Sequence, residues 1–350
     1  MSVPAHPLAA ELDHILAHTE ALWRDVSGCR VCITGGTGFV GTWLLESLVW
    51  ANHNMQAGLS AEVLSRNPKG FLARFPHLGG RPDVRFLAAD IRSPVQISRC
   101  DALVHAAAES DAQRNAADPL AMLDTIVTGT RNVLDAAVSA NSERVLLLSS
   151  GAVYGPQPPH LERINEDFRQ GPRLDDLSSK SLYGEGKRVM EMLGLHYARL
   201  HGCKTSIARC FAFLGPHLPL DRHFAAGNFL RDAHLGRTVA VSGDGRAVRS
   251  YMHPADLAIW LWTMLFRGRS GRAYNVGSDV PVTVGELAQR IAEHAPTHPP
   301  VEILRPPNEG PPERYVPDTR RAREELGMTL TIPSEQAIER TLAWLHRVQQ

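Results

Sequence analysis

The sequence shows no excess of charge of either sign. Its 37 lysines and arginines balance its 37 aspartates and glutamates, so the formal net charge is zero and the isoelectric point is about 7.3. A chain without a net positive field lacks the electrostatic attraction that holds nucleic acids and anionic membranes. We therefore expect neither as a partner, although a local basic pocket for phosphate groups is compatible with this balance.

Long hydrophobic runs are also missing, and cysteine is sparse. The longest charge-free stretch, residues 145–161, is interrupted by two glycines and three prolines, which excludes a membrane-spanning helix there. Acidic residues within the first twenty positions argue against a secretory signal peptide. The five cysteines are an odd number, which favours reduced thiols and a cytoplasmic protein.

Familiar metal-binding spacings are absent as well. Cys29 and Cys32 form a C-x-x-C pair without a second pair to complete a zinc site, so we interpret them as core thiols. The sixteen histidines include no H-E-x-x-H motif, and His105 is interpreted as a packing residue at the end of a strand. The sequence therefore predicts no metal site.

The 350 residues instead alternate short apolar runs with helical stretches. This pattern predicts strands at residues 30–34, 62–65, 84–87, 102–106, 144–149, 204–209 and 273–276. It predicts helices at residues 8–25, 41–50, 119–140, 182–201, 254–267, 284–295 and 319–326, the first of them amphipathic and packed on the outside of the core. Apolar strands separated by helices indicate an α/β fold with a Rossmann-like, doubly wound parallel sheet. Ligands of this fold bind beyond the carboxyl ends of the strands.

A glycine-rich loop joins the first predicted strand to its helix, since residues 34–41 read T-G-G-T-G-F-V-G. Glycines in this context permit the tight turn, the approach of a pyrophosphate and close packing of helix on strand. The loop therefore indicates a dinucleotide cofactor, which we expect to contact Gly35, Thr37, Gly38, Phe39, Val40 and Gly41.

The end of the second strand distinguishes the two nicotinamide cofactors, because an acid there binds a free ribose hydroxyl whereas arginine accommodates a 2′-phosphate. This chain has Arg66 and no acid at that point, which favours NADP(H) over NAD(H). An exposed loop arginine is the alternative interpretation. Asp90 and Ile91, after the third strand, are expected near the adenine.

A tyrosine and a lysine share one face of a predicted helix, because Tyr183 and Lys187 are four residues apart. A phenol is a poor base at neutral pH, and we expect the Lys187 ammonium to lower the pKa of Tyr183. Ser150 follows a buried strand, where its hydroxyl can hydrogen-bond a reacting oxygen. The spacing of Tyr183 and Lys187 alone is weak evidence for a catalytic site. Ser150, however, lies at the carboxyl end of a strand, where the active sites of this fold are expected.

Together these motifs resemble the extended short-chain dehydrogenases/reductases of the NAD(P)-dependent epimerase/dehydratase family, which act mostly on nucleotide sugars. Further matches are H-A-A-A (105–108), S-S-G-A-V-Y-G (149–155), G-D-G-x-x-x-R-S-Y-x-H-P-x-D-L-A (243–258) and Y-N-V-G-S (274–278). The resemblance implies Ser150, Tyr183 and Lys187 as the catalytic set, with Tyr183 as the acid/base. It also implies that Tyr183, Lys187, Ala106 and Ala107 contact the cofactor.

The resemblance also predicts the remaining organisation. The substrate would contact Ser150, Arg249, Arg305 and Asn228, and a homodimer would form through the helices near 119–137 and 183–200. Residues 1–28 would hold the N-terminal helix, and residues 29–215 the NAD(P)-binding domain with a return segment at 251–278. A smaller C-terminal substrate-binding lobe would comprise residues 216–250 and 279–350.

Three departures narrow the predicted activity. Gly151 and Ala152 stand where the family's 4,6-dehydratases carry Asp-Glu, related decarboxylases usually carry Glu at the position of Ala152, and Ala212 replaces a frequent asparagine. The sequences around Ser150 and Tyr183 are similar to those of 4-ketoreductases of the abequose synthase type. We therefore predict an oxidoreductase that reduces a nucleotide sugar at C4 by hydride transfer. The alternatives are a 4-epimerase with tightly bound NAD, a UDP-glucuronate-type decarboxylase and a non-catalytic NADP-sensing regulator.

Overall fold

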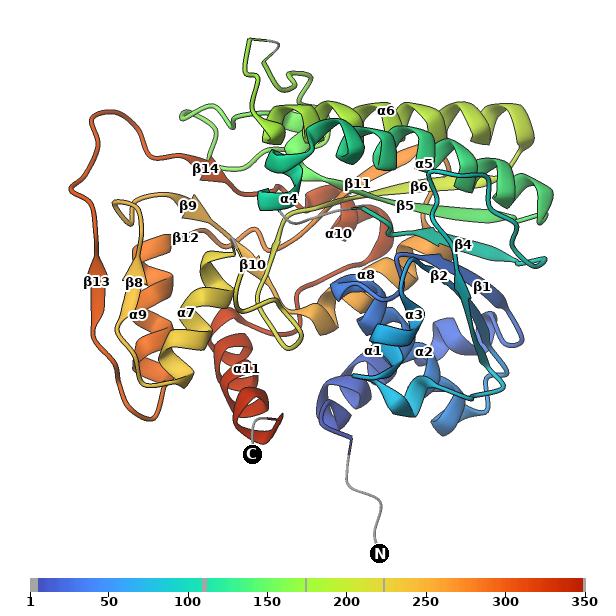
Figure 1. Ribbon diagram of the computed structural model, residues 1–350, viewed down its shortest axis with the longest axis horizontal. Coiled ribbons are helices and arrows are strands. Elements are labelled where there is room, and N and C mark those ends of the chain that lie inside the picture. The colour runs from blue at the N-terminus through green and yellow to red at the C-terminus, as the bar shows by residue number, and fades with distance from the viewer. Residues whose placement is uncertain (1–5, 109–111, 174, 223, 349–350) are drawn as a thin grey trace, which may run out of the picture.

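The computed structural model describes residues 6–108, 112–173, 175–222 and 224–348, and Figure 1 shows its layers. At its centre lies a seven-stranded sheet in the order β11-β6-β5-β4-β1-β2-β3, in which every pairing is parallel. The strands are β1 (Arg30–Thr34), β2 (Ser60–Ser65), β3 (Val84–Ala88), β4 (Ala102–His105), β5 (Arg144–Ser150), β6 (Lys204–Cys210) and β11 (Arg272–Val276). This topology confirms the predicted Rossmann-like fold, including the late strand that returns to the sheet.

Helices cover both faces of the sheet (Figure 1). One layer consists of α1 (Ala9–Asp25), α2 (Phe39–Met55) and α8 (Pro254–Arg267), and the opposite layer of α5 (Pro119–Ser139) and α6 (Ser179–His201). Each layer has its own buried apolar cluster. Helix α8 is apolar on nearly every side because it lies between the sheet and α1. The two-layer arrangement explains why the strands read as almost continuous apolar runs.

Helix α1 packs its apolar face on the helix layer of the sheet. Its side chains Leu12, Ile15 and Trp23 are buried, and the helix packs against α8 and α2. The Trp23 ring meets the Trp262 ring edge-on, with centroids 5.0 Å apart. The predicted helix, packed by its apolar face on the outside of the core, is therefore confirmed, and residues 1–5 of the predicted N-terminal part lie outside the described residues.

The C-terminal lobe gathers short elements beside the sheet (Figure 1). It contains α7 (Ala225–His234), α9 (Val284–His294), α11 (Ser334–Val348), β8 (Val239–Val241), β9 (Val248–Arg249), β12 (Val282–Thr283), β13 (Val301–Ile303) and β14 (Arg314–Tyr315). The sequence analysis assigned no helix to the residues of α7 or α11. The apolar cluster of the lobe continues into that of the α1 layer, so the division into domains stays a prediction.

The remaining elements are short. They are α3 (Pro68–Leu72), η1 (Pro76–Leu78), α4 (Ala112–Ala117), η2 (Gly151–Tyr154), β7 (Ala212–Phe213), β10 (Tyr251–Met252) and α10 (Arg320–Leu326). Helix α6 begins at Ser179, three residues before the predicted start, because Ser178 accepts a hydrogen bond from Ser181 N and caps it. Within the described residues, no helix combines the length and the apolar character needed to cross a lipid bilayer.

Candidate active site

The glycine loop is shaped by close backbone contacts. A Cβ atom at Gly41 would lie 2.3 Å from Gly36 Cα, so α2 can approach the loop only because both positions lack a side chain. Gly35 has a φ of +68°, and a Cβ there would lie 2.6 Å from Ala107 Cα. The structure thus brings the loop together with Ala106 and Ala107, the residues after β4 that the motif analysis also selected.

The remaining loop residues lie at the start of α2 and the end of β2. Gly38 caps α2 with extended backbone, and Phe39 and Val40 form its first turn. The Thr37 hydroxyl lies 2.7 Å from the Ser65 hydroxyl, which ties the loop to the end of β2. Arg66 follows directly and is exposed.

The two residues expected near the adenine lie after β3. The Asp90 carboxylate pairs with Arg92 at 2.6 Å, and this ion pair lowers the pKa of Asp90 to about 2. Arg66 also contributes to that shift through its charge. Ile91 is buried against Gly129 of α5, and its carbonyl accepts a hydrogen bond from Asn132. Asp90 is therefore beside Arg66, whereas Ile91 is held by the α5 layer.

Ser150, Tyr183 and Lys187 converge at the carboxyl end of β5. Ser150 is the last residue of that strand, and its hydroxyl accepts a hydrogen bond from Ala152 N at 3.2 Å. The Ser150 hydroxyl lies near enough to the Tyr183 phenol to influence its ionisation. The Lys187 ammonium donates to the Leu148 carbonyl at 2.8 Å and lies 5.7 Å from the centre of the Tyr183 ring. The structure therefore brings the predicted catalytic set together.

Burial dominates the ionisation of this set. It raises the pKa of Tyr183 well above the ordinary value for tyrosine, and the hydrogen bond from Ser150 opposes the rise without cancelling it. Burial also lowers the pKa of Lys187 to about 8. In the protein without a cofactor burial therefore dominates, and the lowering expected from Lys187 with the help of a positive nicotinamide ring stays a prediction. Near neutral pH the phenol carries its proton and the lysine its charge.

A second tyrosine reaches the site from the C-terminal lobe. The hydroxyl of Tyr315, in β14, lies 3.5 Å from the Cys210 carbonyl, and a Cβ at Gly151, the residue after Ser150, would lie 2.7 Å from it. Its ring packs against Phe211 with the centroids 4.5 Å apart. The sequence analysis missed Tyr315, because no motif connects it to Ser150, which lies 165 positions earlier in the chain.

Arg249, predicted to bind the substrate, lies in β9 and is engaged in an ion pair. Its guanidinium donates to the Glu313 carboxylate at 2.9 Å, and the other carboxylate oxygen of Glu313 accepts from Lys180 at 3.0 Å. Strands β9 and β14 run parallel, and Arg249 lies opposite Tyr315 in their register. A cluster of two cations around one carboxylate therefore adjoins Tyr315.

The other two predicted substrate residues lie apart from this cluster in the fold. Arg305 is exposed in the loop between β13 and β14, a loop that Arg246 holds by donating to the carbonyls of Asn308 and Gly310. Asn228 is partly buried in α7, where its amide oxygen accepts from Arg231 at 3.5 Å. Within the part of the chain that the structure describes, neither side chain hydrogen-bonds or pairs with Ser150 or Tyr183.

A buried polar network supports the catalytic serine from behind. Ser149 donates to Glu191 at 2.5 Å, and Arg209 binds the same carboxylate through two nitrogens, at 3.0 and 2.7 Å. Arg209 also donates to the Tyr154 hydroxyl at 2.9 Å. This network ties β5 to α6 and β6, and so fixes the strand end that carries Ser150 relative to the helix that carries Tyr183.

His105 and the cysteines are packing residues, as predicted. His105 is buried, and its two ring nitrogens lie 2.7 and 3.0 Å from the hydroxyls of Thr34 and Thr130. Burial lowers its pKa to about 3, which keeps the ring neutral. All five cysteines are free thiols, with Cys32 fully buried in the sheet.

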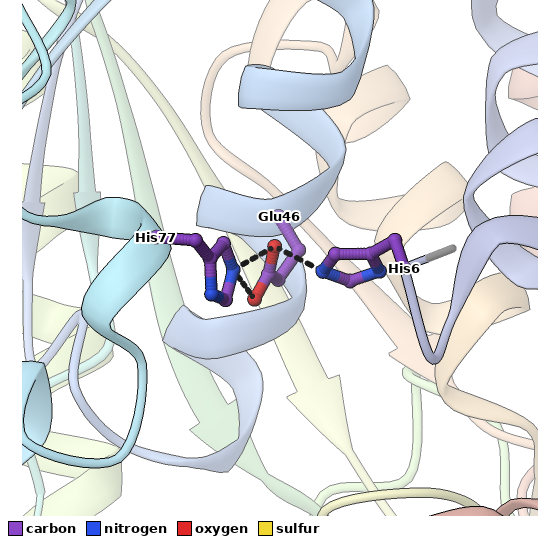
Figure 2. Close-up of side chains that lie close together, drawn as sticks. All are labelled: His6, Glu46 and His77. Carbon is purple, nitrogen blue, oxygen red and sulfur yellow. Dashed lines mark hydrogen bonds and ion pairs between the residues drawn. The ribbon is translucent and has the colours of Figure 1, made fainter. Parts of the chain in front are cut away.

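Figure 2 shows His6, Glu46 and His77 facing one another from three separate segments. The Glu46 side chain is 3% exposed, and its oxygens lie 3.3 Å from His6 Nε2 and 2.8 Å from His77 Nε2. Leu8 N donates to Nδ1 of His6 at 3.2 Å, so the neutral His6 ring carries its proton on Nε2 and donates it to Glu46. Through these contacts Glu46 of α2 hydrogen-bonds to the segments that carry His6 and His77. The expectation of no metal site stays a prediction.

Comparison with known proteins gives this arrangement its context. Residues 31–277 match the model of the NAD dependent epimerase/dehydratase family. UDP-glucuronic acid decarboxylase 1 of Danio rerio is 27% identical over 318 residues, which are 91% of this chain and 73% of the relative. UDP-glucuronic acid decarboxylase 6 of Arabidopsis thaliana is 29% identical over 302 residues, or 86% of this chain and 84% of the relative.

Solved structures agree with the fold. The dTDP-glucose 4,6-dehydratase DesIV of Streptomyces venezuelae, with NAD bound, superimposes with a TM-score of 0.74 at 26% identity, over 91% of this chain and 97% of that one. The UDP-glucose 4-epimerase of Thermotoga maritima gives a TM-score of 0.77 at 20% identity, over 92% and 100% of the two chains, and shows the fold alone. With the match to the family model, these findings confirm the resemblance that the motifs indicated: the chain belongs to the NAD dependent epimerase/dehydratase family of extended short-chain dehydrogenases/reductases and is an enzyme of that class.

Proposed function

We propose that the protein is a 4-ketoreductase that acts on a nucleotide sugar, with Ser150, Tyr183 and Lys187 as its catalytic set. The convergence of these three side chains, with no acidic side chain following Ser150 until Glu162, carries the proposal. Ser150 and Tyr183 would bind the C4 oxygen of the sugar. Because Tyr183 is protonated near neutral pH, it would give its proton to that oxygen as the carbonyl is reduced.

The glycine loop fits the dinucleotide that such a reaction needs. A Cβ at Gly38 would meet the Gly35 carbonyl at 3.3 Å, so the helix start is open to a phosphate group only while this position lacks a side chain. When bound, the nicotinamide would supply the hydride for the C4 carbon. The loop residues 35–41 with Ala106 and Ala107 would hold the dinucleotide, and Lys187 would bind its ribose hydroxyls.

We further propose NADP(H) as the preferred cofactor, with NAD(H) as the alternative. Arg66 is exposed at the end of β2, where a 2′-phosphate would lie, and Asp90 would face the adenine beside it. The ratio of kcat/KM for NADPH and NADH tests this preference. Substitution of Arg66 by alanine should lower that ratio, because only NADPH carries the phosphate that the guanidinium would bind.

The absence of an acid beside Ser150 favours reduction over elimination or decarboxylation. Positions 151 and 152 are glycine and alanine, whereas the resemblance places Asp-Glu in dehydratases and a Glu at the second position in decarboxylases. The relatives named UDP-glucuronic acid decarboxylases make decarboxylation the activity to exclude first. Incubation with UDP-glucuronate and NAD⁺ should release no carbon dioxide.

A 4-epimerase remains the second candidate, because the same catalytic set serves both reactions. Mass spectrometry of small molecules released from the purified protein separates them. A reductase should release little cofactor and should consume NADPH when a 4-keto nucleotide sugar is added. Retained NAD⁺, together with interconversion of nucleotide sugars without net NADPH consumption, would contradict the reductase and favour the epimerase.

We also propose a homodimer through α5 and α6. These helices cover one face of the sheet (Figure 1), and α6 carries apolar side chains that are exposed in the single chain. Met192 is 59% and Leu200 70% exposed, and Leu120 at the start of α5 is 71% exposed. Such side chains favour burial against a second copy. Light scattering after size exclusion should give twice the chain mass, and Met192→Lys should shift it toward the monomer.

A further inference from the structure

Three side chains outside the catalytic set converge from segments that are far apart in the sequence. His6 precedes α1, Glu46 lies within α2, and His77 lies in η1. Each offers one nitrogen or oxygen atom, and these atoms all lie within 4.8 Å of one another (Figure 2). In the part of the chain that the structure describes, no other histidine, cysteine, aspartate or glutamate side chains gather in this way.

The distances within this group are close to those of a metal centre. Ligand atoms around a tetrahedral zinc ion lie about 3.3 Å apart, because each is about 2 Å from the metal. Here Nε2 of His6 lies 3.3 Å from one Glu46 oxygen, and Nε2 of His77 lies 2.8 and 3.1 Å from the two oxygens. Both imidazoles therefore already stand near ligand distance from the same carboxylate.

The two imidazole rings have the mutual placement that a shared ion requires. Two imidazoles bound through Nε2 to one tetrahedral ion have ring centres about 5 Å apart. The ring centres of His6 and His77 are 5.1 Å apart, with the ring planes at 75°. The Trp50 ring lies 5.9 Å from that of His6, and the Phe75 ring lies 6.2 Å from that of His77. Each imidazole thus has an aromatic neighbour that limits its orientations.

The charge at this place favours a cation. The Glu46 side chain is buried, and among the described residues its only ion-pair partners are the two histidines. Two neutral imidazoles would give the carboxylate hydrogen bonds but no counter-charge, whereas a divalent cation supplies the charge as well. The His77 side chain is 42% exposed, so solvent can reach the place where a fourth ligand would bind.

We propose that His6, Glu46 and His77 bind a divalent transition-metal ion, with zinc as the ion that two imidazoles and one carboxylate favour. The sequence analysis expected no metal because it searched for short spacings, whereas 31 positions separate Glu46 from His77. The ion holds the segment before α1 and the η1 turn against α2, the helix that follows the glycine loop.

Binding changes the hydrogen bonding of one ring. Leu8 N donates to Nδ1 of His6 at 3.2 Å, which leaves the ring proton on Nε2. Zinc takes the lone pair of Nε2, and the ring proton moves through water to Nδ1, so the Leu8 amide must turn to solvent. The site therefore loses one hydrogen bond and gains three metal–ligand bonds.

Titration of zinc chloride into the untagged full chain, first stripped with a chelator, tests the inference. Calorimetry should show one ion bound per chain, with a dissociation constant of about 1 μM or lower. Zinc should also raise the midpoint of thermal unfolding by a few degrees, because it binds the folded chain.

His77→Gln separates a metal site from a merely hydrogen-bonded contact. The glutamine amide can still donate to Glu46 but is a poor zinc ligand, so stability without zinc should change little. Zinc affinity should fall at least about 100-fold, since even the loss of a group that only supports a ligand costs about 10- to 100-fold. His6→Gln should behave alike, and His160→Gln, in an exposed turn, is the matched control.

X-ray absorption at the zinc edge identifies the ligands without any variant. It should show nitrogen and oxygen neighbours at about 2.0 Å, whereas sulfur at about 2.3 Å would place the ion on a cysteine and overturn the inference. Absence of binding to the wild-type chain at about 100 μM zinc would overturn it too. So would equal zinc affinities of the wild type, His77→Gln and His6→Gln. None of these outcomes involves the nucleotide sugar, so the reductase proposal stands or falls separately.

Discussion

The two sides of the candidate site are built by different physical means. On the glycine-loop side, backbone packs against backbone, and a single Cβ at Gly41 would lie 2.3 Å from Gly36. On the lobe side, charged side chains meet: Arg249 and Glu313 pair at 2.9 Å, with 21% and 54% of their side chains exposed. The first side tolerates no added atom, whereas the second can open and close at small energetic cost. We infer that the glycine-loop side fixes the cofactor and the lobe side adapts to the substrate.

The largest expected effect lies where the two sides meet, at Tyr183. Tyr183→Phe should lower turnover by about 10²- to 10⁴-fold, because it removes the proton donor. Cofactor affinity should stay within a few-fold, since the glycine loop is untouched. Steady-state kinetics and cofactor titration measure both, with Tyr197→Phe as the control. Unchanged biological activity in this variant would favour a cofactor-sensing regulator.

Removal of the Arg249 side chain should weaken substrate binding on the lobe side and leave the glycine-loop side unchanged. Arg249→Ala should raise KM for the nucleotide sugar by about 10- to 100-fold, because a charged hydrogen bond to the diphosphate is lost, and should leave kcat nearly unchanged. Arg290→Ala, which breaks the exposed ion pair with Glu335, is the control. Equal loss of kcat and kcat/KM would mean that the two sides are not separable.

The pH dependence reports on the buried lysine. Burial lowers the pKa of Lys187 to about 8, below its ordinary value of 10.5, so the ammonium loses its proton as the pH rises through 8. If the charge is required, kcat/KM should fall about tenfold per pH unit above that point. A profile that stays flat to pH 10 would show that the charge of Lys187 is dispensable. Thermal stability measured in parallel excludes unfolding as the cause.

The smallest effect is expected from Glu313. Glu313→Gln removes the carboxylate that competes with a substrate diphosphate for Arg249 and Lys180. Because the pair is half exposed, KM should fall only about two- to fivefold. Glu335→Gln is the matched control on another exposed ion pair. An increase in KM would mean that Glu313 positions Arg249 instead of occupying it.

The same contrast explains what could be predicted from the sequence. The sheet, the glycine loop and the convergence of Ser150 with Tyr183 follow from local patterns, since strand ends meet at one edge of a parallel sheet. Helices α7 and α11 were not predicted, although their buried residues recur with helical spacing. Both are amphipathic helices in polar surroundings, and they are stabilised by packing against each other and against α9.

The contacts across the lobe could not be predicted. Tyr315 lies against Gly151, and Glu313 pairs with Lys180, through the tertiary placement of a two-residue strand that no local pattern specifies. The ionisation of Tyr183 was missed for a related reason, because burial of the whole site outweighs the one charge that spacing reveals. Arg305 remains exposed, and its predicted role in substrate binding is untested.

Strand β14 pairs with β9 over only two residues, so the length of the loop between β13 and β14 determines which side chain lies beside the end of β5. Side chains alternate along a strand, so a shift of β14 by one residue would turn Tyr315 away from Gly151 and present a valine or an arginine there instead. Insertions or deletions between β13 and β14 could thus retune the enzyme while every catalytic residue stays in place. Members of the family could differ in this way, and grafting a loop of another length between β13 and β14 would make the same change by design.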